Sequence, residues 1–330
     1  MAALRSVARI QPRYLVSKIL NPLFDVSRLS YELFVLSTRI SLEIIIATYR
    51  LLIPVSMKNL CGETVLVTGA GHGIGKELAV QLAGMGCIVV CWDNDRDANR
   101  STMNEILEAG GEVYGYVVDV AKRMEIREAV RLMRKVGIPE VTILVNNAAI
   151  LMHKSLLSHE DNEIEDTFAV NVFSNFWTIE AFLPAMLQND KGHIVCMSSM
   201  CGIYGIPQKV PYCSSKFAIR GFMEALREEV RLFQRKLGVR FTTIYPFYVN
   251  TGLARDPKYR FPYIFRAVSP AYAAQEVIKA VRRDYTEYSI PRCLFSLNSI
   301  NRILPESAMR LILDYLADIS NKEQQSEESS

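Results

Sequence analysis

Short apolar segments alternate with longer polar-faced segments from near Glu63 onward. Unbroken apolar runs of this kind are typical of strands buried on both faces, and the intervening helices allow neighbouring strands to run parallel. The pattern therefore predicts an α/β fold, a Rossmann-like doubly wound parallel sheet of about seven strands. The expected strands are Thr64–Thr68, Ile88–Trp92, Val113–Val118, Val141–Val145, His193–Met197, Arg240–Tyr245 and Tyr288–Pro291. The expected helices are Gly75–Gly84, Asp97–Ala109, Arg123–Val136, Asp161–Leu187, Lys216–Lys236 and Pro270–Arg282.

The segment before this alternation has a different composition. Residues 1–60 carry a net charge of +5, although the whole chain of 330 residues carries only +3. The stretch 29–53 is strongly apolar, and its charged residues share one ridge of a helix: Glu32, Arg39, Glu43 and Arg50. Charges near the centre of a membrane span would cost about 2.5–3.5 kcal/mol each, so we expect an in-plane or hairpin helix whose charged ridge faces the lipid headgroups. A helix packed on the globular domain and a mitochondrial transit peptide are the alternatives.

These patterns predict four parts of the chain. Residues 1–60 form a basic and hydrophobic membrane-attachment segment, and residues 61–300 form a single Rossmann-type domain. Residues 301–320 form a C-terminal amphipathic helix, and residues 321–330 a disordered tail. The seven cysteines have no metal-ligand spacing, so we expect free thiols in a reducing compartment and no metal site. The small basic excess argues against a nucleic-acid partner.

A glycine-rich segment, TGAGHGIG at Thr68–Gly75, joins the first expected strand to the first expected helix. Glycines at this position let the backbone approach a pyrophosphate, whose charge faces the helix N-terminus. A tight turn without a ligand is the alternative. Asp93 ends the second strand, where a carboxylate accepts hydrogen bonds from the adenosine ribose and repels a 2′-phosphate. The carboxylate at this position favours NAD(H), although Arg96 could bind the 2′-phosphate of NADP(H). As an alternative, Asp93 could be a turn residue or a helix cap.

Further polar residues end the next strands and begin a helix. Asp119-Val120 follows the third strand and Asn146–Ala149 the fourth, at the edge where open α/β sheets bind ligands. Ser199 follows the fifth strand. Tyr212 and Lys216 are spaced i and i+4, so they share a helical face, where a cation and a positive nicotinamide ring would favour the tyrosinate. An amphipathic helix start is the alternative reading of this last pair.

Together these motifs resemble the short-chain dehydrogenase/reductase family over roughly residues 60–300. The family match is carried by TGAGHGIG, by NNAA at Asn146–Ala149, by Ser199 and by YCSSK at Tyr212–Lys216. The resemblance implies that Tyr212 is the general acid/base, that Lys216 lowers the tyrosine pKa and binds the nicotinamide ribose, and that Ser199 polarises the carbonyl. It also implies that Asn171 anchors a water molecule linked to Lys216. The cofactor-binding residues implied by the resemblance are Gly69, His72, Gly73, Ile74, Gly75, Asp93, Asp119, Val120, Asn147, Tyr212, Lys216, Val249 and Thr251.

The chain departs from the family pattern at two positions. The family's NNAG is NNAA here, ending in Ala149, and Pro-Gly after the sixth strand is Pro246-Phe247. No catalytic residue is lost. Several segments further resemble a membrane-anchored branch that includes the type 11 and 13 17β-hydroxysteroid dehydrogenases, retinol dehydrogenase 10 and the epidermal retinol dehydrogenases. The segments are TGAGHGIGKELA, ILVNNAAI, FWTIEAFLPAML, GHIVCMSSMCG, YCSSKFAIRGF and RILPE.

The branch resemblance implies an enzyme of the endoplasmic reticulum membrane or lipid-droplet surface, with the catalytic domain facing the cytosol and a homodimeric assembly. The segment 252–269, together with Phe247, Tyr248 and residues 203–206, is expected to line an apolar substrate pocket; packing on the core or membrane contact is the alternative. Its apolar residues are Leu253, Tyr259, Phe261, Tyr263, Ile264 and Phe265. The nearby cations are expected to be solvated rim charges: Lys209, Lys258 and Arg260.

The sequence thus predicts an NAD(P)(H)-dependent oxidoreductase that interconverts a lipophilic alcohol and its carbonyl, such as a retinoid, a steroid or a fatty alcohol. NAD(H) is the preferred cofactor and NADP(H) remains open. An NADPH-preferring carbonyl reductase and a lipid-surface scaffold protein with secondary catalysis are the alternative functions.

Overall fold

The computed structural model describes residues 12–236, 238–253, 267–295 and 304–316, and the chain forms two units, Met1–Ser56 and Met57–Ser330. The first unit contains helix α1 (Pro12–Leu52). The sequence predicted a hydrophobic helix over residues 29–53. The helix instead starts on Pro12, where a missing N–H breaks no helical bond, and it continues through Pro22.

The apolar side chains described on α1 are largely exposed, Phe34 and Ile45 among them. Arg28 Nε donates a hydrogen bond of 2.9 Å to Glu32 Oε1 on the charged ridge. Within the part of the chain that the structure describes, no helix combines the length and the apolarity that a bilayer crossing requires.

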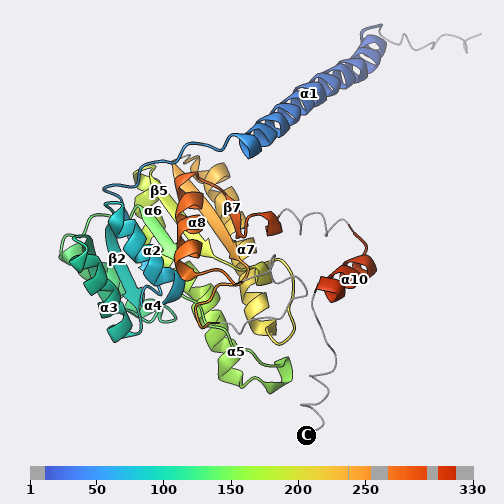
Figure 1. Cartoon of the computed structure of the whole chain (residues 1–330). Coiled ribbons are helices and arrows are strands. Elements are labelled where there is room, and N and C mark those ends of the chain that lie inside the picture. The colour runs from blue at the N-terminus through green and yellow to red at the C-terminus, as the bar shows by residue number, and fades with distance from the viewer. Residues whose placement is uncertain (1–11, 237, 254–266, 296–303, 317–330) are drawn as a thin grey trace, which may run out of the picture. The chain divides into compact units, whose positions relative to one another are not determined.

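The second unit contains a seven-stranded parallel sheet in the order β3-β2-β1-β4-β5-β6-β7, which confirms the predicted Rossmann-like α/β fold (Figure 1). The strands are β1 (Thr64–Thr68), β2 (Ile88–Asp93), β3 (Glu112–Val117), β4 (Ile143–Asn146), β5 (Gly192–Met197), β6 (Val239–Pro246) and β7 (Glu287–Ile290). The chain winds outward in one direction from β1 to β3 and then in the other from β4 to β7. The reversal between β1 and β4 creates the crevice where such sheets bind ligands.

Two apolar cores lie on the two faces of this sheet. The helices are α2 (Gly73–Gly84), α3 (Arg96–Glu108), α4 (Arg123–Lys135), α5 (Asp161–Phe168), α6 (Ser174–Gln188), α7 (Val210–Glu229), α8 (Pro270–Arg282) and, nearer the C-terminus, α10 (Glu306–Leu316). Val65 and Val67 pack under α2 and α8, whereas Leu66 faces α4, α6 and α7. Figure 1 shows α2 and α8 side by side over the same face. The strands are therefore buried on both sides, as their unbroken apolar sequences require.

Two helices near the site differ from the prediction. The expected helix Asp161–Leu187 is divided by a π-helical turn, η2 (Ala169–Phe173), between α5 and α6. A π turn inserts one extra residue and gives no signal in hydrophobic periodicity. Helix α7 begins at Val210 rather than Lys216, because Pro211 is well suited to the first helical turn. Tyr212 and Lys216 consequently both lie within the helix.

Candidate active site

A cavity of about 380 Å³ opens at the carboxyl ends of the central strands. It brings together most residues that the sequence singled out, from the glycine-rich turn to the start of α7. The predicted site residues that line it are Gly69, His72, Gly73, Ile74, Asp93, Asp119, Val120, Asn147, Ser199, Tyr212, Lys216, Val249 and Thr251. Gly75 and Asn171 do not line it; they lie behind the wall and shape it.

The glycine-rich turn is built around close backbone contacts. Gly69 and Gly73 have φ values of 66° and 54°, a region that favours glycine. A Cβ at Gly75 would lie 1.9 Å from the Gly69 carbonyl oxygen, so only glycine lets α2 start this close to β1. His72 precedes α2 and makes no side-chain capping bond, which leaves the first N–H groups of the helix directed at the cavity wall. This arrangement fits a pyrophosphate.

Thr68 and Asn147 join the turn to the end of β4. The Thr68 hydroxyl accepts hydrogen bonds from the backbone N–H groups of Asn147 and Ala148, at 2.9 and 3.1 Å. In return, Asn147 Nδ2 donates to the carbonyls of Thr68 and Gly69, at 2.9 and 3.2 Å. Asn147 therefore holds two strand ends together, and Thr68, its reciprocal partner, was not identified from the sequence as a site residue.

Asp93 lines the cavity with a carboxylate that is 8% exposed. Its Oδ2 accepts from the Gly71 N–H at 2.7 Å and its Oδ1 from the Asp95 N–H at 2.9 Å. The cap of α3 is Asp95, not Asp93, so the helix-cap alternative for Asp93 is wrong. Each carboxylate oxygen can accept a further hydrogen bond, and Asp93 therefore fits the ribose-binding role as well as its role in the turn.

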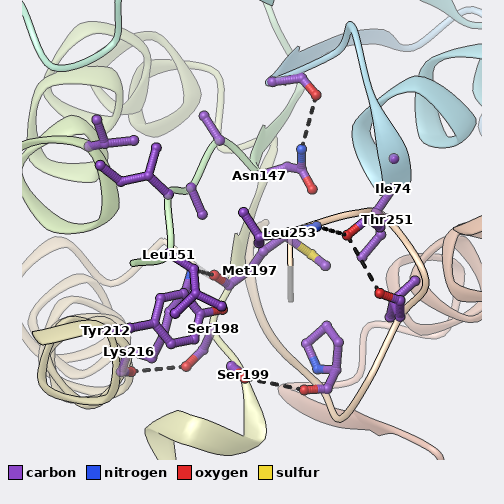
Figure 2. A pocket seen from close by; sticks show the side chains of 18 of the residues that line it. Ile74, Asn147, Leu151, Met197, Ser198, Ser199, Tyr212, Lys216, Thr251 and Leu253 are labelled. Carbon is purple, nitrogen blue, oxygen red and sulfur yellow. Dashed lines mark hydrogen bonds between the residues drawn. The ribbon is translucent and has the colours of Figure 1, made fainter. Parts of the chain in front are cut away.

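Ser199, Tyr212 and Lys216 gather on the side of the cavity opposite Asn147 and Ile74 (Figure 2). Lys216 is 2% exposed, and its Nζ donates to the Met197 carbonyl at 2.8 Å. The Lys216 ammonium lies 5.4 Å from the centroid of the Tyr212 ring. Ser199 accepts a hydrogen bond from the Cys201 N–H at 3.1 Å and holds its hydroxyl at the end of β5.

Burial controls the protonation of this pair. Loss of solvation raises the pKa of Tyr212 above its ordinary value, and a hydrogen bond with Ser199 partly opposes the rise. Loss of solvation also lowers the pKa of Lys216 from 10.5 to about 8. The predicted lowering of the Tyr212 pKa by Lys216 and by a positive nicotinamide ring stays a prediction.

Two cysteines beside Tyr212 were not identified from the sequence. Cys201 and Cys213 are buried in one apolar cluster with Tyr212, which Leu151 and Ile206 complete. The mutual influence of the two thiols lowers the pKa of Cys213 and raises that of Cys201. Their closeness to Ser199 and Tyr212 in the sequence was the available signal.

Asn171 lies in the π turn and contacts the site indirectly. Its side chain accepts from the Ile150 N–H at 2.8 Å and donates to the Ile150 carbonyl at 2.9 Å and to Ser215 Oγ at 3.1 Å. Ile150 lines the cavity, and Ser215 adjoins Lys216. Asn171 thus fixes the loop after β4 against α7, and its water-anchoring role stays a prediction.

The substrate side of the cavity is only partly described. Phe247, Tyr248, Ile206 and Leu253 line the cavity as expected, whereas Ile203 is buried in a separate cluster. The expected wall residues between 254 and 266 lie outside the described part of the chain, as do Lys258 and Arg260. The prediction that Lys209 is a solvated rim charge is wrong, because Lys209 is only 9% exposed and lines the cavity.

Comparison with known proteins agrees with this geometry. The family model described as short chain dehydrogenase matches residues 63–259. Short-chain dehydrogenase/reductase family 16C member 6 of Bos taurus is 37% identical over 275 residues, which are 82% of this chain and 86% of that protein. Human epidermal retinol dehydrogenase 2 is 35% identical and covers 87% of this chain and 93% of its own length. Human 17-beta-hydroxysteroid dehydrogenase 13 is 35% identical, with 79% and 85% covered.

Solved structures show the same fold. A short-chain dehydrogenase/reductase from Burkholderia phymatum in complex with NAD has a TM-score of 0.66 and 23% identity, over 75% of this chain and 95% of that one. A metagenomic short-chain oxidoreductase in complex with NADP has a TM-score of 0.58 and 27% identity, over 70% and 98%.

The chain belongs to the short-chain dehydrogenase family. It is an alcohol dehydrogenase or reductase of that family, and the relatives named above place it in the predicted branch.

The lowered pKa of Lys216 predicts a specific pH dependence of stability. Below pH 8 the lysine is protonated in both folded and unfolded chains, so the folded protein bears the full free-energy cost of burying the charged ammonium. This cost is relieved as the pH rises from about 8 to 10.5, because the folded chain can then release the proton. Across that window, the free energy of unfolding of the wild type should rise relative to Lys216→Met by up to about 3 kcal/mol. Urea unfolding at pH 7 and pH 10 measures this difference.

Lys191→Met is the control, since Lys191 is largely exposed and pairs with Glu63 on the surface. Its difference from the wild type should change little over the same pH interval. Equal pH dependence for the Lys216 and Lys191 variants would contradict the assignment.

Proposed function

We propose that the cavity interconverts a lipophilic alcohol and its carbonyl with NAD(H), and that Tyr212 is the general acid/base. The observation that carries the proposal is the convergence of Ser199, Tyr212 and Lys216 on one wall of a cavity whose opposite wall is a dinucleotide-type glycine turn. The bound cofactor supplies a nicotinamide ring that accepts or donates hydride. Human relatives named for retinol and for 17-beta-hydroxysteroids support a retinoid, a steroid or a fatty alcohol as substrate.

Ser199, Tyr212 and Lys216 would have different roles in the reaction. The Ser199 hydroxyl would hold the substrate oxygen, and the Tyr212 hydroxyl would take the alcohol proton during oxidation or return it during reduction. Lys216, held by the Met197 carbonyl, would fix the cofactor ribose and place a positive charge beside the tyrosine ring. The apolar wall around Tyr212 excludes water from the reacting atoms.

Tyr212→Phe tests this assignment. The ring keeps its packing and loses only the hydroxyl, so turnover should fall at least about 1000-fold, while the affinity for the dinucleotide changes less than about threefold. A screen of retinoids, steroids and fatty alcohols with NAD⁺ and NADP⁺ gives the rates, and dinucleotide titration by intrinsic fluorescence gives the affinities. Retained turnover in the variant would exclude Tyr212 as the acid/base.

We further propose that NAD(H) is preferred because the Asp93 carboxylate occupies the position where a 2′-phosphate would lie. Asp93→Asn removes the charge and keeps a hydrogen-bond acceptor for the turn, so it is milder than alanine. The ratio of kcat/KM for NAD(H) to that for NADP(H) should fall about tenfold or more. Damage to the turn would weaken the binding of both cofactors alike. An unchanged ratio of kcat/KM would therefore refute the role of Asp93 in selecting NAD(H). A wild type that prefers NADPH would favour the carbonyl-reductase alternative.

We also propose that residues 1–60 attach the enzyme to the membrane of the endoplasmic reticulum or to lipid droplets, with residues 61–300 as the catalytic domain on the cytosolic side. The support is the exposed apolar surface of α1 together with the basic charge of the segment. The exposed aromatics Phe173, Phe176 and Phe217 lie on η2, α6 and α7, and they support the proposed homodimer.

Attachment through α1 predicts loss of membrane binding when its apolar surface is made polar. In the full chain, substitution of Leu33, Leu36, Ile40 and Ile44 by Asn should move most of the protein from the floating to the soluble fraction in flotation with phosphatidylcholine vesicles. Met124→Asn combined with Leu157→Asn is the control, since both residues are exposed and apolar and lie in the second unit. Equal flotation of both variants would exclude α1 as the anchor.

A further inference from the structure

Lys209 is a buried cation that the proposed chemistry does not use. It lies just before α7, is 9% exposed and lines the cavity. Among the residues that the structure describes, no group forms a hydrogen bond or an ion pair with its ammonium. The two other lysines near the site differ, because Lys216 donates to the Met197 carbonyl and Lys154 pairs with Glu163 at 2.5 Å.

The backbone holds Lys209 in place. The preceding Gln208 has a φ of 59°, and its carbonyl accepts from the Lys154 N–H at 3.0 Å. The Lys209 carbonyl accepts from the Cys213 N–H at 2.8 Å, which is the first hydrogen bond of the helix that carries Tyr212. Lys209 and Tyr212 are three residues apart, a spacing that brings side chains to neighbouring positions at this end of a helix.

Lys209 lies near an apolar cluster of the cavity wall. The positive charge acts on the thiols of Cys201 and Cys213, which pack against Tyr212 together with Leu151 and Ile206. Leu151 lies directly beside Tyr212 in Figure 2. A second positive charge, besides that of Lys216, therefore faces the space next to the general acid/base, beside an apolar cluster suited to hydrocarbon.

An ammonium without a partner among the described residues, placed in such a wall, selects among substrates. While the cavity holds water, the ammonium is hydrated; a purely hydrocarbon substrate would displace that water and leave the charge unpaired, which is costly. A substrate with an anionic oxygen replaces the lost hydration by a charge-assisted hydrogen bond. One ammonium balances one negative charge, which favours a carboxylate over a phosphate dianion.

We propose that the substrate is a lipophilic alcohol or ketone that also carries a carboxylate, and that Lys209 binds this carboxylate. The inference rests on the proposed function and narrows its substrate class. In the oxidation, the carbinol carbon would give a hydride to NAD⁺ and the hydroxyl proton would pass to the deprotonated Tyr212, so that the carbonyl, NADH and neutral Tyr212 are formed. The carboxylate is unchanged and serves only to position the substrate.

Matched acids and esters test the inference. A series of hydroxylated fatty acids with different spacings between hydroxyl and carboxylate is compared with the methyl esters of the same acids, using the full-length enzyme. The wild type should favour at least one acid over its ester, and Lys209→Met should lower that acid-to-ester ratio of kcat/KM roughly 10- to 100-fold. Lys154→Met, which also removes one positive charge near the site, should keep the wild-type ratio. The same ratio in the wild type and in Lys209→Met would overturn the inference.

A binding measurement separates this inference from the proposed function. Dodecanoate and dodecanol are titrated into the wild type and into Lys209→Met in the presence of NAD⁺, which requires no turnover. The carboxylate site is supported if the wild type binds dodecanoate more tightly than dodecanol and Lys209→Met does not. This result supports the site even where no alcohol of the series is oxidised. Absence of that preference in the wild type overturns the carboxylate site, even where alcohols are oxidised.

Discussion

The reciprocal hydrogen bonds between Thr68 and Asn147 are the constraint on which the rest of the site depends. They fix the end of β1 to the end of β4 at the point where the sheet changes winding direction. Asn147 Nδ2 also lies so close to Gly75 that a side chain there would meet it at 2.5 Å. The turn, the start of α2 and the loop after β4 are therefore one packed unit, and a ligand that contacts any of them meets a preformed surface.

Burial on the opposite wall has a different effect. Tyr212 and Lys216 are removed from water, and each loses the solvation of its charged form, so the pKa of the tyrosine rises and that of the lysine falls. Tyr212 therefore favours its neutral form, whereas Lys216, with a pKa of about 8, keeps its positive charge at neutral pH. The protein supplies position, dryness and the charge of Lys216, and the positive nicotinamide ring would come with the cofactor.

Much of this structure could be predicted from the sequence, for reasons that differ among the elements. The buried parallel strands could be found because burial on both faces leaves an unbroken apolar run, as in β1, and β1 has the predicted bounds. The glycine turn and the Tyr212/Lys216 pair could be found because local spacing determines local geometry. Lys209 could not be assigned, since its neighbours along the chain encode neither its burial nor the lack of a partner for its ammonium in the part of the chain that the structure describes. The contacts of Asn171 with Ile150 and Ser215 likewise depend on tertiary packing.

The π turn at Ala169–Phe173 sets the rotational phase of everything that follows it in the helix. Each residue of an α-helix turns the chain by about 100°, so one inserted residue reorients the entire face of α6 relative to α5. In the observed phase, Ile179 and Phe182 enter the sheet core while Asn171 faces the loop after β4. After deletion of one residue from this turn, the helix could keep either the packing of α6 in the apolar core or the polar contacts of Asn171, but not both. The number of residues in the π turn therefore determines both the packing of the core and the contacts at the catalytic edge of this enzyme.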